Sequence, residues 1–220
     1  MNNIKKYFLP SALLTAFVLW TWAVSAVDVQ PIGPLGTAVG FATLNGLFHR
    51  LTGVHMGLYT LTDWLGLVPL GVCAAFGLLG LGQWLHRKSL GRVDGDLLIL
   101  GGFYLAVMAA FAAFEILEVN YRPILIDGRL EASYPSSTTM LVLCVMPTAR
   151  MQLRRRLRSP FLVRLASLAI PLFTAFMVLS RTLCGVHWFT DIAGGALLSA
   201  GLVAFYRSMI LSNSGLNSPK

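Results

Sequence analysis

Six long apolar runs, separated by short polar segments, dominate the chain. They cover about residues 8–27, 58–85, 97–118, 139–149, 161–179 and 190–211. A helix of roughly 20 apolar residues crosses the hydrocarbon core of a bilayer. The pattern therefore predicts an all-α fold, a polytopic bundle of about six transmembrane helices in a single integral membrane domain that comprises residues 1–220.

The fourth apolar run is short. It becomes long enough to span only if its helix begins in the polar stretch Ser136-Ser137-Thr138-Thr139, which would place those hydroxyl groups at one face of the membrane.

Residues 31–57, between the first two runs, are moderately apolar and rich in glycine. Their larger apolar residues repeat at the spacing of one helical face: Leu44, Leu47, Phe48 and Leu51. We expect a helix in the membrane interface that packs on the bundle as a lid or wedge, in preference to a direct chemical role for His49 or His55.

Composition agrees with a membrane solvent. Hydrophobic residues make up 56% of the 220 positions, charged residues 12%, and the mean hydropathy is +0.71, which lies outside the range of soluble globular domains.

Basic residues gather on alternate loops. Arg50, Arg122, Arg129 and Arg181 fall on one side of a six-span arrangement, and the other thirteen of the 17 Lys and Arg fall on the opposite side. The basic side is expected to be cytoplasmic, with both termini there. Topology and anionic lipid explain the net charge of +8, so no nucleic-acid partner is predicted.

The N-terminal run has two interpretations. Lys5-Lys6, an apolar stretch and Ala23-Val24-Ser25-Ala26 resemble a signal peptide with a cleavage site. We favour an uncleaved anchor in the plasma or inner membrane, because the run is longer than a usual signal core and gives an even number of spans.

The most informative polar string lies between the last two runs. Ser180-Arg181 is followed by His187 and then by Asp191. Ionisable residues are costly in a bilayer and usually mark function there. On one helical face, a carboxylate four positions after a histidine holds one ring nitrogen and leaves the other free to act as a nucleophile.

The six-span topology brings two further segments to the same extracytoplasmic face. Arg122 follows the third run and, with Arg181, offers a planar fork of donors for a phosphate. Behind Pro135, the free backbone N–H groups of Ser136, Ser137 and Thr138 would open a helix, and such an end binds anions.

The spacing Ser-Arg-x5-His-x3-Asp, preceded by Arg-Pro and Pro-Ser, resembles the type 2 phosphatidic acid phosphatase family, which includes vanadium haloperoxidases. The resemblance covers about residues 97–211. It implies that Arg181 binds phosphate, that His187 is the nucleophile and that Asp191 orients it. Arg122 and Ser136, with Ser137 beside it, would complete the phosphate site.

Two positions depart from the family's pattern. Glu115 stands where the first motif has a lysine, and Thr138 stands where the second has a histidine that acts as the general acid. Glu115, Glu118 and Tyr134 are the candidate replacement proton donors, although the two glutamates are better interpreted as ion-pair partners of Arg122 or Arg181.

Three accounts stay open: a phosphatase whose leaving group needs little protonation, such as an isoprenoid diphosphate; a phosphatase in which another residue supplies the proton; and a catalytically silent protein that binds or transports a lipid phosphate. We predict a phosphatase that acts on a lipid phosphate or diphosphate through a phosphohistidine and that uses no metal or cofactor. Membrane lipids are the expected partners, and the sequence sets no oligomeric state.

Overall fold

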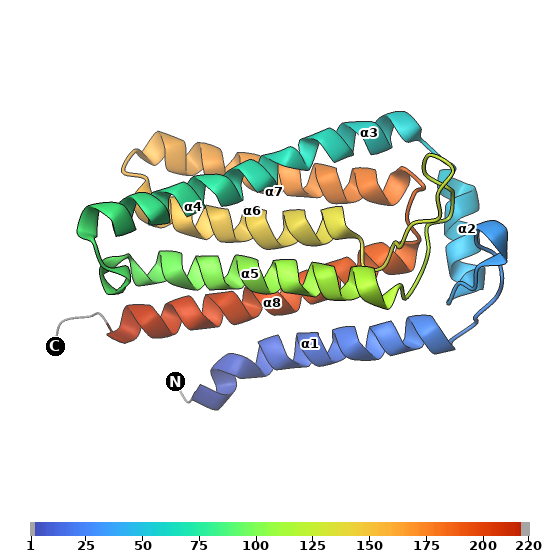
Figure 1. Ribbon diagram of the computed structural model, residues 1–220, viewed down its shortest axis with the longest axis horizontal. Helices are drawn as coiled ribbons and strands as arrows, with labels where there is room; N and C mark the ends of the chain where they lie inside the picture. Colours follow the sequence, from blue (N-terminus) through green and yellow to red (C-terminus); the bar gives the residue numbers. More distant parts are fainter. Residues whose placement is uncertain (1–2, 217–220) are drawn as a thin grey trace.

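The computed structural model describes residues 3–216, and these form a bundle of long, roughly parallel helices (Figure 1). The helices are α1 (Asn3–Ala26), α2 (Ala42–Thr52), α3 (Met56–Leu65), α4 (Leu67–Arg87), α5 (Gly95–Leu117), α6 (Ser137–Arg156), α7 (Pro160–Leu183) and α8 (Phe189–Leu216). Short 3-10 turns lie at Pro34–Gly36 and Leu90–Arg92. The predicted all-α fold is confirmed.

Five segments of the described chain are long and apolar enough to cross a bilayer. They are Lys5–Ala26, Met56–Arg87, Gly95–Leu117, Pro160–Leu183 and Phe189–Ser212. The protein is therefore a multi-pass membrane protein, and five of the six expected spans meet this criterion.

Helix α6 is the exception to the six-span expectation. It begins at Ser137, inside the polar stretch as predicted, and its 20 residues reach about 30 Å. It packs against α4, α5, α7 and α8, so other helices rather than lipid surround much of it. A helix in that position tolerates polar residues where they find partners, as Gln152 does by donating to the hydroxyl of Tyr206 at 2.8 Å.

Helix α1 packs along α8. Gly201 of α8 faces Leu14 so closely that a β-carbon there would lie 2.8 Å from a methyl group of the leucine. Gly194 likewise leaves room for the ring of Tyr134, which lies between α1 and α8. These glycines allow the close helix approach that positions the loop before α6.

Helix α2 crosses one end of the bundle (Figure 1), and its orientation differs from a simple apolar wedge. Leu44, Leu47 and Leu51 are exposed, whereas Asn45 is fully buried and hydrogen bonds to Thr190 and to the carbonyl of Gly40. The helix packs on the bundle as predicted, but only Phe48 of the apolar repeat faces inward, against Phe189, while the inward Asn45 satisfies buried backbone groups.

The beginning of α1 and the end of α8 lie at the same end of the bundle, and α2 lies at the opposite end (Figure 1). The loop between α4 and α5 and the loop between α6 and α7 also lie at the first end. The arginine-rich segments thus share one end with both termini. We call this end the basic end and the other the α2 end.

Candidate active site

Three segments that are distant in sequence meet at the α2 end of the bundle. They are the loop between α5 and α6, the first turn of α6, and the loop between α7 and α8. Backbone bonds join them: the N–H of Ser136 donates to the carbonyl of Asp191 at 3.1 Å. The indole N–H of Trp188 donates to the carbonyl of Tyr121 at 2.7 Å.

The loop that carries His187 is held by tight backbone packing. Gly185 has a φ of 71°, and a β-carbon there would lie 1.9 Å from the carbonyl oxygen of Gly53. A side chain is therefore excluded by both conformation and space. On the other side, the His49 ring nitrogen Nε2 lies 3.2 Å from the carbonyl of Gly185. His49 supports the loop and does not itself join the cluster described below.

His187 and Asp191 face each other as their spacing predicts. His187 Nδ1 lies 3.7 Å from Asp191 Oδ2, and both side chains are buried. The carboxylate is fixed by two other donors, because Oδ2 accepts the backbone N–H of Trp188 at 3.0 Å and Oδ1 accepts the amide of Asn120 at 3.2 Å. The carboxylate is thus fixed beside the ring, although Nδ1 has no hydrogen-bond partner within the described residues.

Arg122 lies on the opposite side of the imidazole. Its Nη1 is 3.1 Å from His187 Nε2 and 3.4 Å from the carbonyl of Val186, while its Nε donates to Glu131 at 3.0 Å. A guanidinium has donors only, so Nε2 must be the accepting nitrogen and Nδ1 carries the proton. The lone pair of Nε2 therefore points toward the guanidinium groups.

Arg181 lies near the end of α7 and is 2% exposed. Its guanidinium carbon lies 4.7 Å from the ring centre of Tyr59, and that of Arg122 lies 6.0 Å from the same ring. Nη1 donates to the hydroxyl of Thr62 at 3.2 Å, and Nη2 is 4.0 Å from the exposed Asp63. The buried Nε has no hydrogen-bond partner within the described part of the chain.

The pKa of His187 is lowered to about 4, first because burial disfavours the charged ring and further because Arg122 and Arg181 are positive, although Asp191 opposes the change. The imidazole is consequently neutral near pH 7. A neutral ring with an unprotonated Nε2 is the form in which histidine acts as a nucleophile.

At the start of α6, one of the three backbone N–H groups predicted to bind an anion is already occupied. Ser136 cannot offer its N–H to a ligand because Asp191 already accepts it, and its buried hydroxyl accepts a hydrogen bond from Thr139. The phosphate-binding role predicted for the Ser136 amide is wrong in this respect. Ser137 and Thr138 instead line a cavity of about 320 Å³ together with Asp63, which lies beside Arg181.

The three candidate proton donors are exposed or are bonded to other residues. Glu115 and Glu118 are exposed, and Glu118 accepts the hydroxyl of Tyr121 at 2.8 Å. The hydroxyl of Tyr134 is 2.7 Å from that of Thr21 in α1. The prediction that the glutamates pair with Arg122 or Arg181 is wrong, because Glu131 and Asp63 are the carboxylates that do so.

Sequence reasoning missed the contribution of α3, which supplies Tyr59, Thr62 and Asp63 to the surroundings of Arg181. A signal was available for Asp63, since it is a carboxylate within a long apolar run and such residues usually have a functional partner. Nothing in the spacing indicated Glu131, which reaches Arg122 across an isolated bridge between Tyr121 and Ala132.

These features define a class: a multi-pass helical membrane protein in which two arginines, a histidine and an aspartate form a buried anion-type site at one end. The family model of the PAP2 superfamily matches residues 111–214. The resemblance predicted from the motifs is confirmed over this region.

The fold is similar to a solved membrane protein. That structure is described as the first transmembrane PAP2 type phosphatidylglycerolphosphate phosphatase, from Bacillus subtilis. The TM-score is 0.65 at 19% identity, and the match covers 93% of this chain and 97% of the other. No curated protein matches the sequence.

Proposed function

We propose that the protein is a lipid-phosphate phosphatase that works through a phosphohistidine on His187. The observation that carries the proposal is the placement of one neutral imidazole between an orienting carboxylate and two guanidinium groups. Nδ1 faces Asp191, and Nε2 faces Arg122, with Arg181 across the ring of Tyr59. The match of residues 111–214 to the PAP2 superfamily model supports it.

The proposed reaction has two steps. The Nε2 lone pair of His187 attacks the phosphorus atom, a nitrogen–phosphorus bond forms, and the bond to the leaving oxygen breaks. Water then attacks the phosphohistidine and releases inorganic phosphate, which restores the free imidazole. Asp191 stabilises the positive ring in between, and Arg122 and Arg181 stabilise the equatorial oxygens. This scheme needs no metal ion.

Electrostatics favours an anionic occupant. Arg181 is buried with one unpaired N–H, and its nearest carboxylate, Asp63, is 4.0 Å away and exposed. A buried charge without full compensation is unfavourable. A phosphoryl group between the two guanidinium groups would supply that compensation and would take over the donor that Arg122 now directs at Nε2.

The leaving group selects among substrates. The described residues around His187 include neither the family's acidic histidine nor the candidate donors Glu115, Glu118 and Tyr134. When the leaving group is already a weak base, such as the inner phosphate of an isoprenoid diphosphate, the rate of its departure falls little in the absence of a general acid. The cavity beside Thr138 has the apolar walls Leu67, Leu70, Met108 and Phe111, which suit a lipid tail.

The alternative is a protein that binds or transports a lipid phosphate without hydrolysing it. The observation that favours this alternative is the same missing acid, since positioned proton transfer is typically worth about 10²–10⁴-fold in rate. Both functions use Arg122 and Arg181, so an assay of turnover separates them and an assay of binding does not.

Phosphate release by the purified protein tests the proposal. We expect release from an isoprenoid diphosphate in detergent, reduced about 10²–10³-fold by Arg181→Ala because a preorganised donor to the transition state is lost. Arg129→Ala removes an exposed arginine at the same end and should leave the rate unchanged. If intact protein with an unaltered melting temperature releases no phosphate, the non-hydrolysing alternative is correct.

We further propose that the basic end is cytoplasmic and the site extracytoplasmic, because loops rich in arginine remain inside. A cysteine at Arg158, in the exposed loop between α6 and α7, is expected to be protected from impermeant thiol reagents in intact cells. A cysteine at the exposed Arg129 is expected to be labelled. The reverse labelling pattern would invert the orientation.

A further inference from the structure

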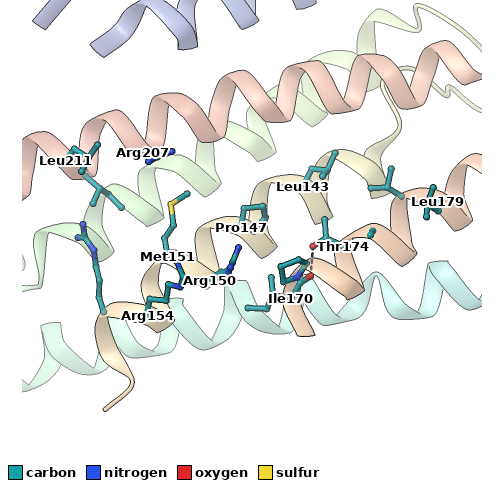
Figure 2. Close-up of a pocket in the computed structure, with 15 residues that line it drawn as sticks. Leu143, Pro147, Arg150, Met151, Arg154, Ile170, Thr174, Leu179, Arg207 and Leu211 are labelled. Carbon is teal, nitrogen blue, oxygen red and sulfur yellow. Dashed lines mark hydrogen bonds between the residues drawn. The ribbon is translucent and has the colours of Figure 1, made fainter. Parts of the chain in front are cut away.

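A cavity between three helices of the bundle lies away from the candidate active site. It has a volume of about 940 Å³ and lies between α6, α7 and α8. Figure 2 shows that it extends along these helices, with Leu143 and Leu179 toward one end, Arg154 and Arg207 toward the other, and Arg150 between. The arginines occupy the half of the cavity nearer the basic end.

The described lining of this cavity carries positive charge. Four arginines, Arg150, Arg154, Arg155 and Arg207, line it, and none of its lining residues is an aspartate or glutamate. The nearby carboxylates are engaged elsewhere, because Asp94 pairs with Arg87 and Arg156, and Asp96 pairs with Arg156. A concave surface with four positive charges favours an anionic ligand.

An unsatisfied donor of Arg150 is the strongest indication that this cavity binds a hydrogen-bond acceptor. Its Nε atom is buried and has no hydrogen-bond partner in the part of the chain that the structure describes. Arg154 donates to the hydroxyl of Ser167 in the neighbouring helix at 3.2 Å. Buried donors are nearly always paired in proteins, and guanidinium forks match the oxygens of a phosphate.

Apart from Thr174, whose hydroxyl donates to the carbonyl of Ile170, the remainder of the lining is apolar and has the length of a lipid chain in one leaflet. Leu143 precedes Arg154 by eleven positions on α6, a distance of about 16 Å at 1.5 Å per helical residue. Half of a hydrocarbon core is roughly 15 Å. Ile170, Ala175, Val178 and Leu179 of α7 form the facing wall.

We propose that this cavity is a binding site for an anionic phospholipid of the leaflet at the basic end. The phosphate of the headgroup lies among Arg150, Arg154 and Arg207, and one acyl chain lies along the apolar wall toward Leu143 and Leu179. The site is separate from the cluster around His187, and the proposal holds whether or not that cluster turns over substrate.

A phospholipid fits better than a soluble anion for two reasons. The charged part of the cavity lies where a bundle helix meets the interface, at the level where anionic headgroups concentrate. The apolar part would otherwise be a hydrophobic surface that only lipid tails can cover in a bilayer. One molecule with both parts satisfies the arginines and the leucines together.

Lipid retention by the purified protein tests this site. Native mass spectrometry of delipidated protein titrated with phosphatidylglycerol is expected to show one tightly bound lipid, with phosphatidylcholine bound far more weakly. The Arg150→Gln/Arg154→Gln variant should bind phosphatidylglycerol about tenfold or more weakly, since two charge-assisted contacts are lost.

The matched control is Arg158→Gln/Arg164→Gln. It removes the same charge from exposed positions at the same end, outside the cavity. This variant should retain phosphatidylglycerol as the unaltered protein does. The proposal is overturned if both double variants lose the lipid equally, which would indicate general surface attraction, or if neither loses it.

A second pair of variants tests the apolar part of the cavity and leaves the net charge of the protein unchanged. Ala175→Trp fills the exposed lining of the cavity, whereas Ala169→Trp adds the same bulk at an exposed position of α7 outside it. Only Ala175→Trp is expected to weaken phosphatidylglycerol binding. If binding survives Ala175→Trp unchanged, the arginines bind headgroups at the surface and no chain enters the cavity. That result would also overturn the proposal.

Discussion

Phosphate release is expected to fall by at least about 10³-fold when His187 is replaced by alanine. The imidazole is the proposed nucleophile of the cluster, because Arg122 and Arg181 are donors only and Asp191 is held by Trp188 and Asn120 on the far side of the ring from Arg122. Without it, the phosphoryl group is bound but has no nucleophile. The measurement is phosphate release from an isoprenoid diphosphate under single-turnover and steady-state conditions.

His86→Ala is the control for this substitution. His86 is exposed near the end of α4, at the basic end, so its loss should leave the rate unchanged. His187 is buried, and its loss could also disturb the loop, so the melting temperature of each variant should be measured in the same detergent. Turnover by a folded His187→Ala protein at the rate of the parent would exclude the phosphohistidine.

Replacement of Thr138 by histidine is expected to raise the hydrolysis of lipid monophosphates by about 10²–10⁴-fold. Monophosphate esters leave as alkoxides, which require a proton, and the threonine hydroxyl has no accessible pKa near neutrality. Thr138 lines the cavity that also contains Asp63 and thus lies near Arg181. A histidine introduced there would stand at the family's general-acid position.

The comparison of two substrates gives this experiment its internal control. Hydrolysis of the diphosphate should change little in Thr138→His, because its leaving group is already a weak base. Equal acceleration of both substrates would point to better binding rather than proton donation. An unchanged monophosphate rate in a folded protein would show that a group other than position 138 supplies the acid in this chain.

The core of the site was predictable because local spacing encodes it. His187 and Asp191 are four positions apart across the start of α8, so their approach to 3.7 Å needs little more than that helix start. Arg122 and Arg181 each stand at the end of a long apolar run, where a membrane topology with alternating loops places both on the same face. The structure brings both to Tyr59.

The partners of these residues were not predictable in the same way. Glu115 and Glu118 are near Arg122 in sequence, but α5 ends at Leu117 and Glu118 has a positive φ of 44°. The chain turns there, and it is Glu131 that reaches the guanidinium. Ser136 similarly follows Pro135 as a helix start should, yet its N–H is bonded to a residue 55 positions later.

Helix α2 likewise combines a feature that local spacing predicted with one that tertiary packing decided. The leucine repeat predicted a helix correctly, because periodicity is a local property, but it could not indicate which solvent the leucines would meet. In a membrane the apolar face of an outer helix is free to point outward. Asn45 and His49 could then face the loop of His187 and satisfy its backbone.

The sequence alone was enough to predict the membrane environment, the all-helical class, the alternation of basic and less basic loops, and the approach of the His187 imidazole to the Asp191 carboxylate. Each of these depends on composition or on spacings within one helical turn or one run. The tertiary structure decided which carboxylates and hydroxyls meet the arginines, which way α2 faces, and that α6 is largely enclosed by other helices. It also decided that four arginines and an apolar wall share one cavity. Such pairings depend on how helices pack side by side, and packing is a property of surfaces that are formed only after the helices exist.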